Sequence, residues 1–322
     1  MKRDQKQPNM FRELLGEPTE AKTSGLAFSA ATVLPYLLSF AFSVICAALG
    51  LLGDGVEKKE WFLYASFLLP QISFATVAFG YFHLTKTSVK SVVGKPKPMD
   101  FVLAVMLQFG LFSLGGLNSW FVGFLESLGL KIPELTHPSL NGFGLYGVLL
   151  TVAVLPAIFE ETIFRGVLLK GLKSFPWWAA ALISGTMFSL FHQNPAQTIY
   201  QFFCGAAFAL IAIRSGSILP TVVAHFLNNA FIILAEKFAW QTDMLPIMID
   251  SAVCLLLALA YLLVGFMKDE KNDDSEEAAT ESVKQKSNLS LAEKAEKKHF
   301  FLCAAVGFLV CVIGWIAGLF GG

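Results

Sequence analysis

The sequence predicts an all-α protein, a polytopic transmembrane bundle of about eight or nine membrane helices. Hydrophobic residues make up 55% of the 322 residues and charged residues only 15%, whereas a soluble domain carries about 25% charged residues. Several stretches of ~18 or more residues lack Asp, Glu, Lys and Arg, and each is long enough to cross the hydrocarbon core as a helix. The net charge is zero, and no basic stripe indicates nucleic-acid binding.

Apolar segments follow one another along most of the chain, and their boundaries can be read to within a few residues. The five cysteines lie inside these segments without the spacing of a metal site or a disulfide framework, so we expect them to pack as small apolar residues. The apolar segments cover residues 25–53, 61–84, 101–128, 143–173, 176–193, 196–213, 218–238, 246–267 and 300–318.

The charges between the segments predict the orientation in the membrane. Lys and Arg number 20 on the side of the N-terminus and four on the opposite side, and cytoplasmic loops carry the excess. We therefore expect the N-terminus in the cytoplasm. The predicted organisation is a cytoplasmic N-terminal tail (1–24), N-terminal membrane helices (25–142), a helical core (143–240), an additional membrane helix (241–267), a charged, flexible or loosely helical cytoplasmic connector (268–299) and a C-terminal membrane helix (300–322).

Polar side chains inside hydrocarbon are the informative ones, because an ionised group at mid-membrane costs on the order of 3 kcal/mol on insertion scales. Three neighbouring segments carry such side chains. A helix rises ~1.5 Å per residue, and counting from turns on one side of the membrane places four of these groups within about two helical turns. The polar residues are Glu160, Glu161 and Arg165 in the fourth segment, His192 at the end of the fifth, and His225, Asn228 and Asn229 in the seventh.

The spacing within the fourth segment separates the roles of its two acids. Glu161 and Arg165 are four residues apart, so they share a helix face and can neutralise each other. Glu160 lies about 100° around the helix without a local partner. A carboxyl group in that position can take and return a proton, and His192 can share this proton or hold a water molecule against the carboxyl group.

The seventh segment supplies hydrogen-bond donors. His225 and Asn229 are four residues apart on one face, and an imidazole beside a carboxamide can stabilise an oxyanion. Taken singly, the ion pair of Glu161 can be structural, and Asn228 or Asn229 can simply bond to a neighbouring helix. The co-location of all these groups favours water activation and attack on a peptide carbonyl. By contrast, we expect His137 to be solvated.

At these residues the chain resembles the CPBP family of intramembrane proteases, also called the CAAX amino-terminal protease or Abi family. The motifs E-E-x-x-x-R at 160–165, F-x-x-x-H at 188–192 and H-x-x-x-N at 225–229 stand in that order, and the resemblance covers roughly residues 145–235. It implies a glutamate-dependent endopeptidase with its site buried in the bilayer. By motif position, Glu160 and His192 act on water, His225 and Asn229 stabilise the oxyanion, and Glu161 and Arg165 support the site.

The metal dependence has two interpretations. Glu160, His192 and His225 would make a His₂Glu zinc site, and the family is often labelled as metalloproteases for that reason. The chain lacks H-E-x-x-H, however, and the chemistry above works without a metal through Glu160 and a water molecule. We expect a metal-free site, with zinc as the alternative.

The expected partners are a membrane-associated peptide or protein substrate and the lipid bilayer. The resemblance implies a bacterial cell membrane, where relatives are associated with peptide maturation, bacteriocin self-immunity and envelope control. The alternative function is a non-catalytic membrane scaffold or a bacteriocin self-immunity protein. A transporter would also explain buried ionisable residues, but the sequence has no visible internal repeat.

Overall fold

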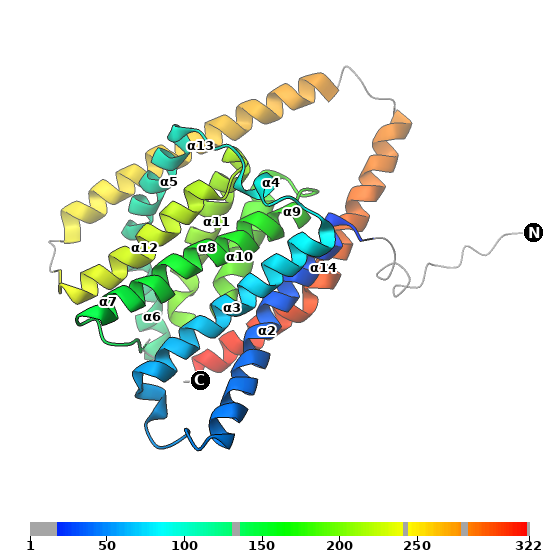
Figure 1. Ribbon diagram of the computed structural model, residues 1–322. Coiled ribbons are helices and arrows are strands. Elements are labelled where there is room, and N and C mark those ends of the chain that lie inside the picture. Colours follow the sequence, from blue (N-terminus) through cyan, green and yellow to red (C-terminus); the bar gives the residue numbers. More distant parts are fainter. Residues whose placement is uncertain (1–17, 131–135, 241–243, 278–282, 321–322) are drawn as a thin grey trace, which may run out of the picture.

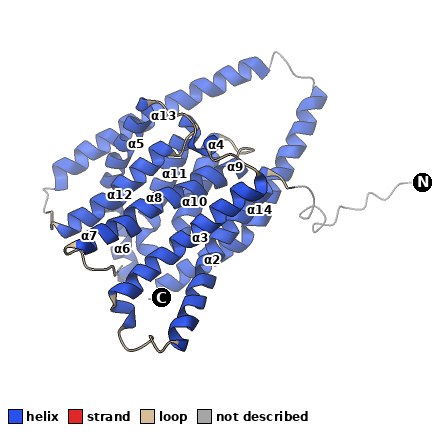
Figure 2. Ribbon diagram, viewed as in Figure 1, coloured by secondary structure: helices blue, strands red, loops and turns tan. Residues whose placement is uncertain are grey.

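The computed structural model describes residues 18–130, 136–240, 244–277 and 283–320, and the regular structure of these residues is entirely helical (Figures 1 and 2). Eight helical stretches in them are long and apolar enough to cross a membrane. The predicted polytopic all-α membrane bundle is thereby confirmed. The eight stretches are Glu20–Ala48, Glu60–Thr85, Pro98–Ser127, Phe143–Gly171, Pro195–Ser215, Leu219–Lys237, Ile249–Asp269 and Leu291–Leu319.

Two groups of helices flank the centre of the bundle (Figure 1). Helix α2 (Glu20–Ala48) packs along α14 (Val283–Leu319) and α3 (Glu60–Thr85) on one side. On the other side α5 (Pro98–Leu111) packs against α13 (Met244–Glu277). The helices that carry the predicted motifs therefore lie between these groups (Figure 1). The other α-helices are α4 (Lys90–Val93), α6 (Gly115–Ser127), α7 (Phe143–Val148), α8 (Leu155–Glu161), α9 (Leu169–Gly171), α10 (Trp177–Phe191), α11 (Thr198–Ser215) and α12 (Leu219–Lys237).

The fifth apolar segment, at 176–193, is shorter as a helix than the others. Helix α10 has 15 residues, from Trp177 to Phe191, which at ~1.5 Å per residue gives about 22 Å, less than the hydrocarbon thickness. It begins after Pro176 and ends where His192 forms its C-cap. The motif histidine is thus at the end of a short helix that stops inside the bundle.

The fourth span alternates between α-helix and the wider π-helix. The stretches Leu149–Val154 and Thr162–Leu168 are π-helical, and α8 (Leu155–Glu161) lies between them. Such π-helical turns occur mostly at functional sites in proteins. Both acids of the first motif are the last residues of this α-helical insert, so the irregular backbone lies directly beside them.

The expected N-terminal tail and the expected charged connector are both helical in the parts that the structure describes. Helix α2 begins at Glu20, inside the expected tail 1–24, and Thr19 caps it by accepting a hydrogen bond from the Lys22 N–H at 3.4 Å; residues 1–17 lie outside the described residues. In the expected connector 268–299, α13 continues to Glu277 and α14 begins at Val283.

Candidate active site

A cavity of about 430 Å³ lies between α3, α8, α12 and the α10–α11 hairpin. Its lining includes the four residues that the sequence predicts as catalytic, from three different helical segments. The structure therefore brings these side chains to one space. They are Glu160, His192, His225 and Asn229, and Asn228 lies beside them.

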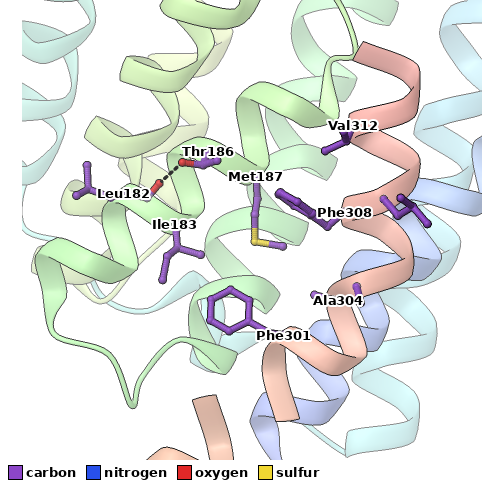
Figure 3. Close-up of a pocket in the computed structure, with 10 residues that line it drawn as sticks. Leu182, Ile183, Thr186, Met187, Phe301, Ala304, Phe308 and Val312 are labelled. Carbon is purple, nitrogen blue, oxygen red and sulfur yellow. Dashed lines mark hydrogen bonds between the residues drawn. The ribbon is translucent and has the colours of Figure 1, made fainter. Parts of the chain in front are cut away.

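A larger cavity of about 650 Å³ lies between α10 and α14 (Figure 3). Its lining is apolar apart from Thr186, whose hydroxyl donates to the Leu182 carbonyl at 2.9 Å. No acid, base or nucleophile lines it. The chemistry therefore belongs to the smaller cavity.

The carboxyl group of Glu160 is the predicted catalytic acid of the fourth segment, and it lines the cavity. The side chain comes from α8, the residue is 9% exposed, and its Oε2 atom is buried without a hydrogen-bond partner among the described residues. Glu160 is close enough to His192 for an electrostatic interaction. A buried carboxylate oxygen with no protein partner is available to a water molecule or a substrate.

The second acid, Glu161, forms a buried ion pair through Oε1, while its Oε2, like that of Glu160, has no hydrogen-bond partner among the described residues. Its Oε1 atom accepts a hydrogen bond from Arg165 Nη1 at 2.9 Å, as the four-residue spacing predicts, and both side chains are completely buried. Arg165 also donates to the Gly205 carbonyl at 3.2 Å and lies 4.4 Å from the ring centre of Phe188. A Cβ atom on Gly205 would stand 2.8 Å from the Cα of Gly185, so this glycine lets α10 and α11 approach closely.

Both histidines are anchored through the same ring atom. His225 Nδ1 donates to Glu161 Oε1 at 3.0 Å, a contact between helices that the sequence analysis missed. His192 Nδ1 lies 2.8 Å from the Phe188 carbonyl oxygen, which can only accept, so this nitrogen carries the proton. In each ring, Nε2 remains the atom that can act on a ligand in the cavity.

The amide of Asn229 is held at both ends. Its Nδ2 donates to the Val152 carbonyl at 2.8 Å, and its Oδ1 accepts from Asn228 Nδ2 at 2.8 Å. A carboxamide has two N–H groups, so one of them remains for a ligand.

Other polar side chains line the cavity without having been predicted. Gln71, on α3, is 6% exposed and has an Oε1 atom without a partner in the described part of the chain. His137, which was expected to be solvated, is partly exposed, with 21% of its side chain accessible, and its Nε2 lies 2.8 Å from Glu236 Oε1 at the cavity. Gln71 and His137 are isolated polar residues outside any motif, so the spacing of residues in the sequence could not predict that they line the cavity.

The loop that follows His192 is braced by helices far away in the sequence. Asn118, on α6, donates to the Ala196 carbonyl at 2.8 Å. Trp315, on α14, donates through Nε1 to the Thr198 hydroxyl at 2.7 Å. The position of the histidine therefore depends on helices outside the core.

Gly314 and Gly318 contribute to the same bracing. A Cβ atom on Gly318 would stand 2.9 Å from the Gln193 carbonyl oxygen and 2.8 Å from the Pro195 ring, and one on Gly314 would collide with the Gln193 side chain. These glycines thus let α14 lie directly against the loop that carries on from His192.

The three candidate zinc ligands do not form a ready metal site. Among the residues that the structure describes, no three His, Cys, Asp or Glu side chains group closely enough to hold a metal ion. The anchored Nδ1 atoms leave one nitrogen on each histidine, but Glu160 does not complete a cluster with them. We therefore derive no chemical step through a metal.

Comparison with known proteins supports the family resemblance of the core. Residues 142–231 match the family described as type II CAAX prenyl endopeptidase Rce1-like. The chain is 22% identical over 216 residues to the Bacillus subtilis (strain 168) protein named "Putative membrane peptidase YdiL", covering 66% of this chain and 84% of that protein. It is also 36% identical over 83 residues, 24% of this chain, to an uncharacterised 24.3 kDa protein of Escherichia coli, of whose length it spans 38%. No solved structure shows a significant match.

Proposed function

We propose, from the Rce1-like domain at residues 142–231 and the cavity within it, that this membrane protease is an intramembrane endopeptidase of membrane-associated peptides or proteins. The observation that carries the proposal is that one cavity is lined by Glu160, whose buried Oε2 has no partner among the described residues, and by His192, whose Nδ1 is fixed by a backbone carbonyl. This pair can bind and activate a water molecule.

Glu160 acts as the general base. Its carboxylate takes a proton from the water, whose oxygen bonds to the peptide carbonyl carbon while the carbonyl oxygen gains negative charge. His192 holds the water through Nε2. When the C–N bond breaks, the proton passes to the leaving nitrogen, and the carboxylate is restored.

His225 and Asn229 stabilise the oxyanion. Asn229 offers its second amide N–H, because the first is bound to the Val152 carbonyl. His225 donates to the oxyanion through Nε2 in the ring form that carries an N–H group on both nitrogens, since Nδ1 is bound to Glu161. Removing one such donor lowers kcat by about 100-fold to 1,000-fold in other hydrolases.

The site lies in a bacterial cell membrane with the N-terminus in the cytoplasm. The 20-to-four distribution of Lys and Arg supports this orientation. Cysteine labelling of variants with a single cysteine at the N-terminus or in the loop 136–142 tests it, since the two should lie on opposite sides.

The experiment that tests the proposed function compares the reconstituted protein with its Glu160→Gln variant, which keeps the shape of the side chain but removes the base. Each is incubated with a library of hydrophobic peptides, and new peptide ends are identified by mass spectrometry. We expect specific cleavage by the natural protein and a loss of at least ~100-fold in the variant.

The control variant is Glu20→Gln, which removes a surface carboxylate 2.9 Å from Lys173. It should cleave normally. If Glu160→Gln folds and cleaves as well as the natural protein, Glu160 is not the base, and the scaffold or immunity function replaces the peptidase.

A further inference from the structure

The orientation of the Asn229 amide decides what it presents to the cavity. With Nδ2 toward the Val152 carbonyl, the side chain offers an N–H group; rotated by 180°, it would offer a carbonyl oxygen that repels an oxyanion. Asn228 Nδ2 enforces the first orientation because it donates to Asn229 Oδ1 at 2.8 Å.

Asn228 is itself oriented by residues of two other helices. Its Oδ1 accepts from Gln108 Nε2 at 2.8 Å and from the Tyr200 hydroxyl at 2.7 Å. Gln108 Nε2 also lies 3.1 Å from the Tyr200 oxygen, to which it donates. Gln108 on α5 and Tyr200 on α11 thus donate to Asn228, and Asn228 in turn donates to Asn229.

The last acceptor in this series of hydrogen bonds is the backbone carbonyl of Val152, which lies four residues before a proline. Val152 lies in the π-helical stretch Leu149–Val154, and Pro156, four residues further on, has no N–H to donate to its carbonyl. The carbonyl is therefore open to Asn229 Nδ2, which binds it at 2.8 Å.

The chain of hydrogen bonds is buried and leaves one group unpaired. Gln108 is 2% exposed, and its Oε1 has no partner among the residues described. Reversing this amide would set two acceptors, Gln108 Oε1 and Asn228 Oδ1, against each other. A buried unpaired acceptor costs about 1–3 kcal/mol, so the arrangement is retained against a stability penalty.

We infer that Gln108, Tyr200 and Asn228 are positioning residues that fix the Asn229 amide with an N–H toward the reacting peptide carbonyl. This inference rests on the proposed function. Gln108 lies outside the residues that match the family, and none of the three is a motif residue.

Asn228→Asp separates positioning from simple helix contact. Aspartate keeps the oxygen that accepts from Gln108 and Tyr200 but loses the N–H that holds Asn229. We expect kcat to fall by about 10-fold or more with KM changed less than about twofold, because the lost orientation is felt in the transition state. Tyr200→Phe, which removes one hydroxyl, should lower kcat in the same way.

A double-mutant cycle shows whether these residues act through Asn229. In an Asn229→Ala background, Asn228→Asp and Tyr200→Phe should each change kcat less than about twofold. The rates are measured on one peptide cleaved in the library experiment. Independent, multiplying effects in the double variants would overturn the inference, as would an unchanged kcat in Asn228→Asp.

Ser29→Ala is the matched control. Ser29 also bridges two buried helices, since its hydroxyl donates to the Cys303 carbonyl at 2.7 Å, but it is not part of the cavity lining. It should leave kcat unchanged. Glu160→Gln is assayed in parallel: if it is inactive while residues 200 and 229 act independently, only the positioning inference fails. Full cleavage by Glu160→Gln overturns the proposed function and the inference together.

Discussion

His225 Nδ1 lies 3.0 Å from Glu161 Oε1, the same oxygen that accepts from Arg165 at 2.9 Å. One carboxylate oxygen therefore holds both a histidine of the cavity and a buried cation. The second acid of the motif thus fixes the site without lining the cavity.

The Glu161→Gln variant should be strongly destabilised, because it leaves the guanidinium of Arg165 buried without a negative partner. Breaking a buried ion pair from one side costs about 3–5 kcal/mol. Denaturation of the purified protein in bicelles measures the loss. The double variant Glu161→Gln with Arg165→Met removes both charges and should be more stable than Glu161→Gln alone; equal stability would mean that the unpaired charge is not the cause.

Peptide cleavage should survive metal chelation. The described residues contain no group of three His, Cys, Asp or Glu that could hold an ion, and the proposed steps use side chains and water only. Cleavage rates are measured before and after incubation with 1,10-phenanthroline and dialysis. Loss of activity that added zinc restores, and magnesium does not, would contradict this prediction and favour the His₂Glu zinc site.

The pairing of His137 with Glu236 should depend on pH. Burial lowers the pKa of His137, but hydrogen bonds to the Pro138 carbonyl and to Glu236, together with the Glu236 charge, outweigh this effect and raise the pKa above its ordinary value of 6.5. The ion pair therefore contributes its full stability below pH 6.5, and this contribution is lost as the pH rises through the raised value.

An NMR titration of labelled His137 measures this pKa. Glu236→Gln should move the midpoint down toward 6.5, whereas Glu60→Gln, which removes a carboxylate bound to the Ser139 N–H in the same loop, should not. A midpoint that is the same in the natural protein and in Glu236→Gln would refute the prediction.

Substitution of Gly318 should impair peptide cleavage, although this glycine is not part of the cavity lining. The Cβ of Gly318→Val would press on the Gln193 carbonyl and the Pro195 ring, next to His192. We expect a destabilisation of about 1–3 kcal/mol, typical of overpacking, and a lower kcat at temperatures where the protein remains folded. Gly123→Val is the control, because no atom lies within 4 Å of the added Cβ; equal effects at both positions would exclude bracing as the explanation.

Much of the candidate site could be predicted from the sequence, because the helical period shows which residues of one helix lie on the same face. Ionisable groups stand out in apolar segments, so Glu160 and His225 were visible, and the four-residue spacing of Glu161 and Arg165 gave their ion pair directly. These are interactions within one helix, or polar groups at matching depth.

The contacts between different helices could not be predicted from the spacing of residues along the sequence. The partner of His225 is Glu161 on another helix, whereas spacing suggested only Asn229 on its own helix. Gln108 and Tyr200 are isolated polar residues, and their meeting at Asn228 depends on how three helices cross.

The bracing of the loop after His192 by α14 has a consequence for biosynthesis. Residues 142–231 leave the ribosome well before Trp315 and Gly318, so the motif residues enter the membrane while this side of the loop still lacks its support. The histidine acquires its final environment only when the last described helix has been inserted beside α2.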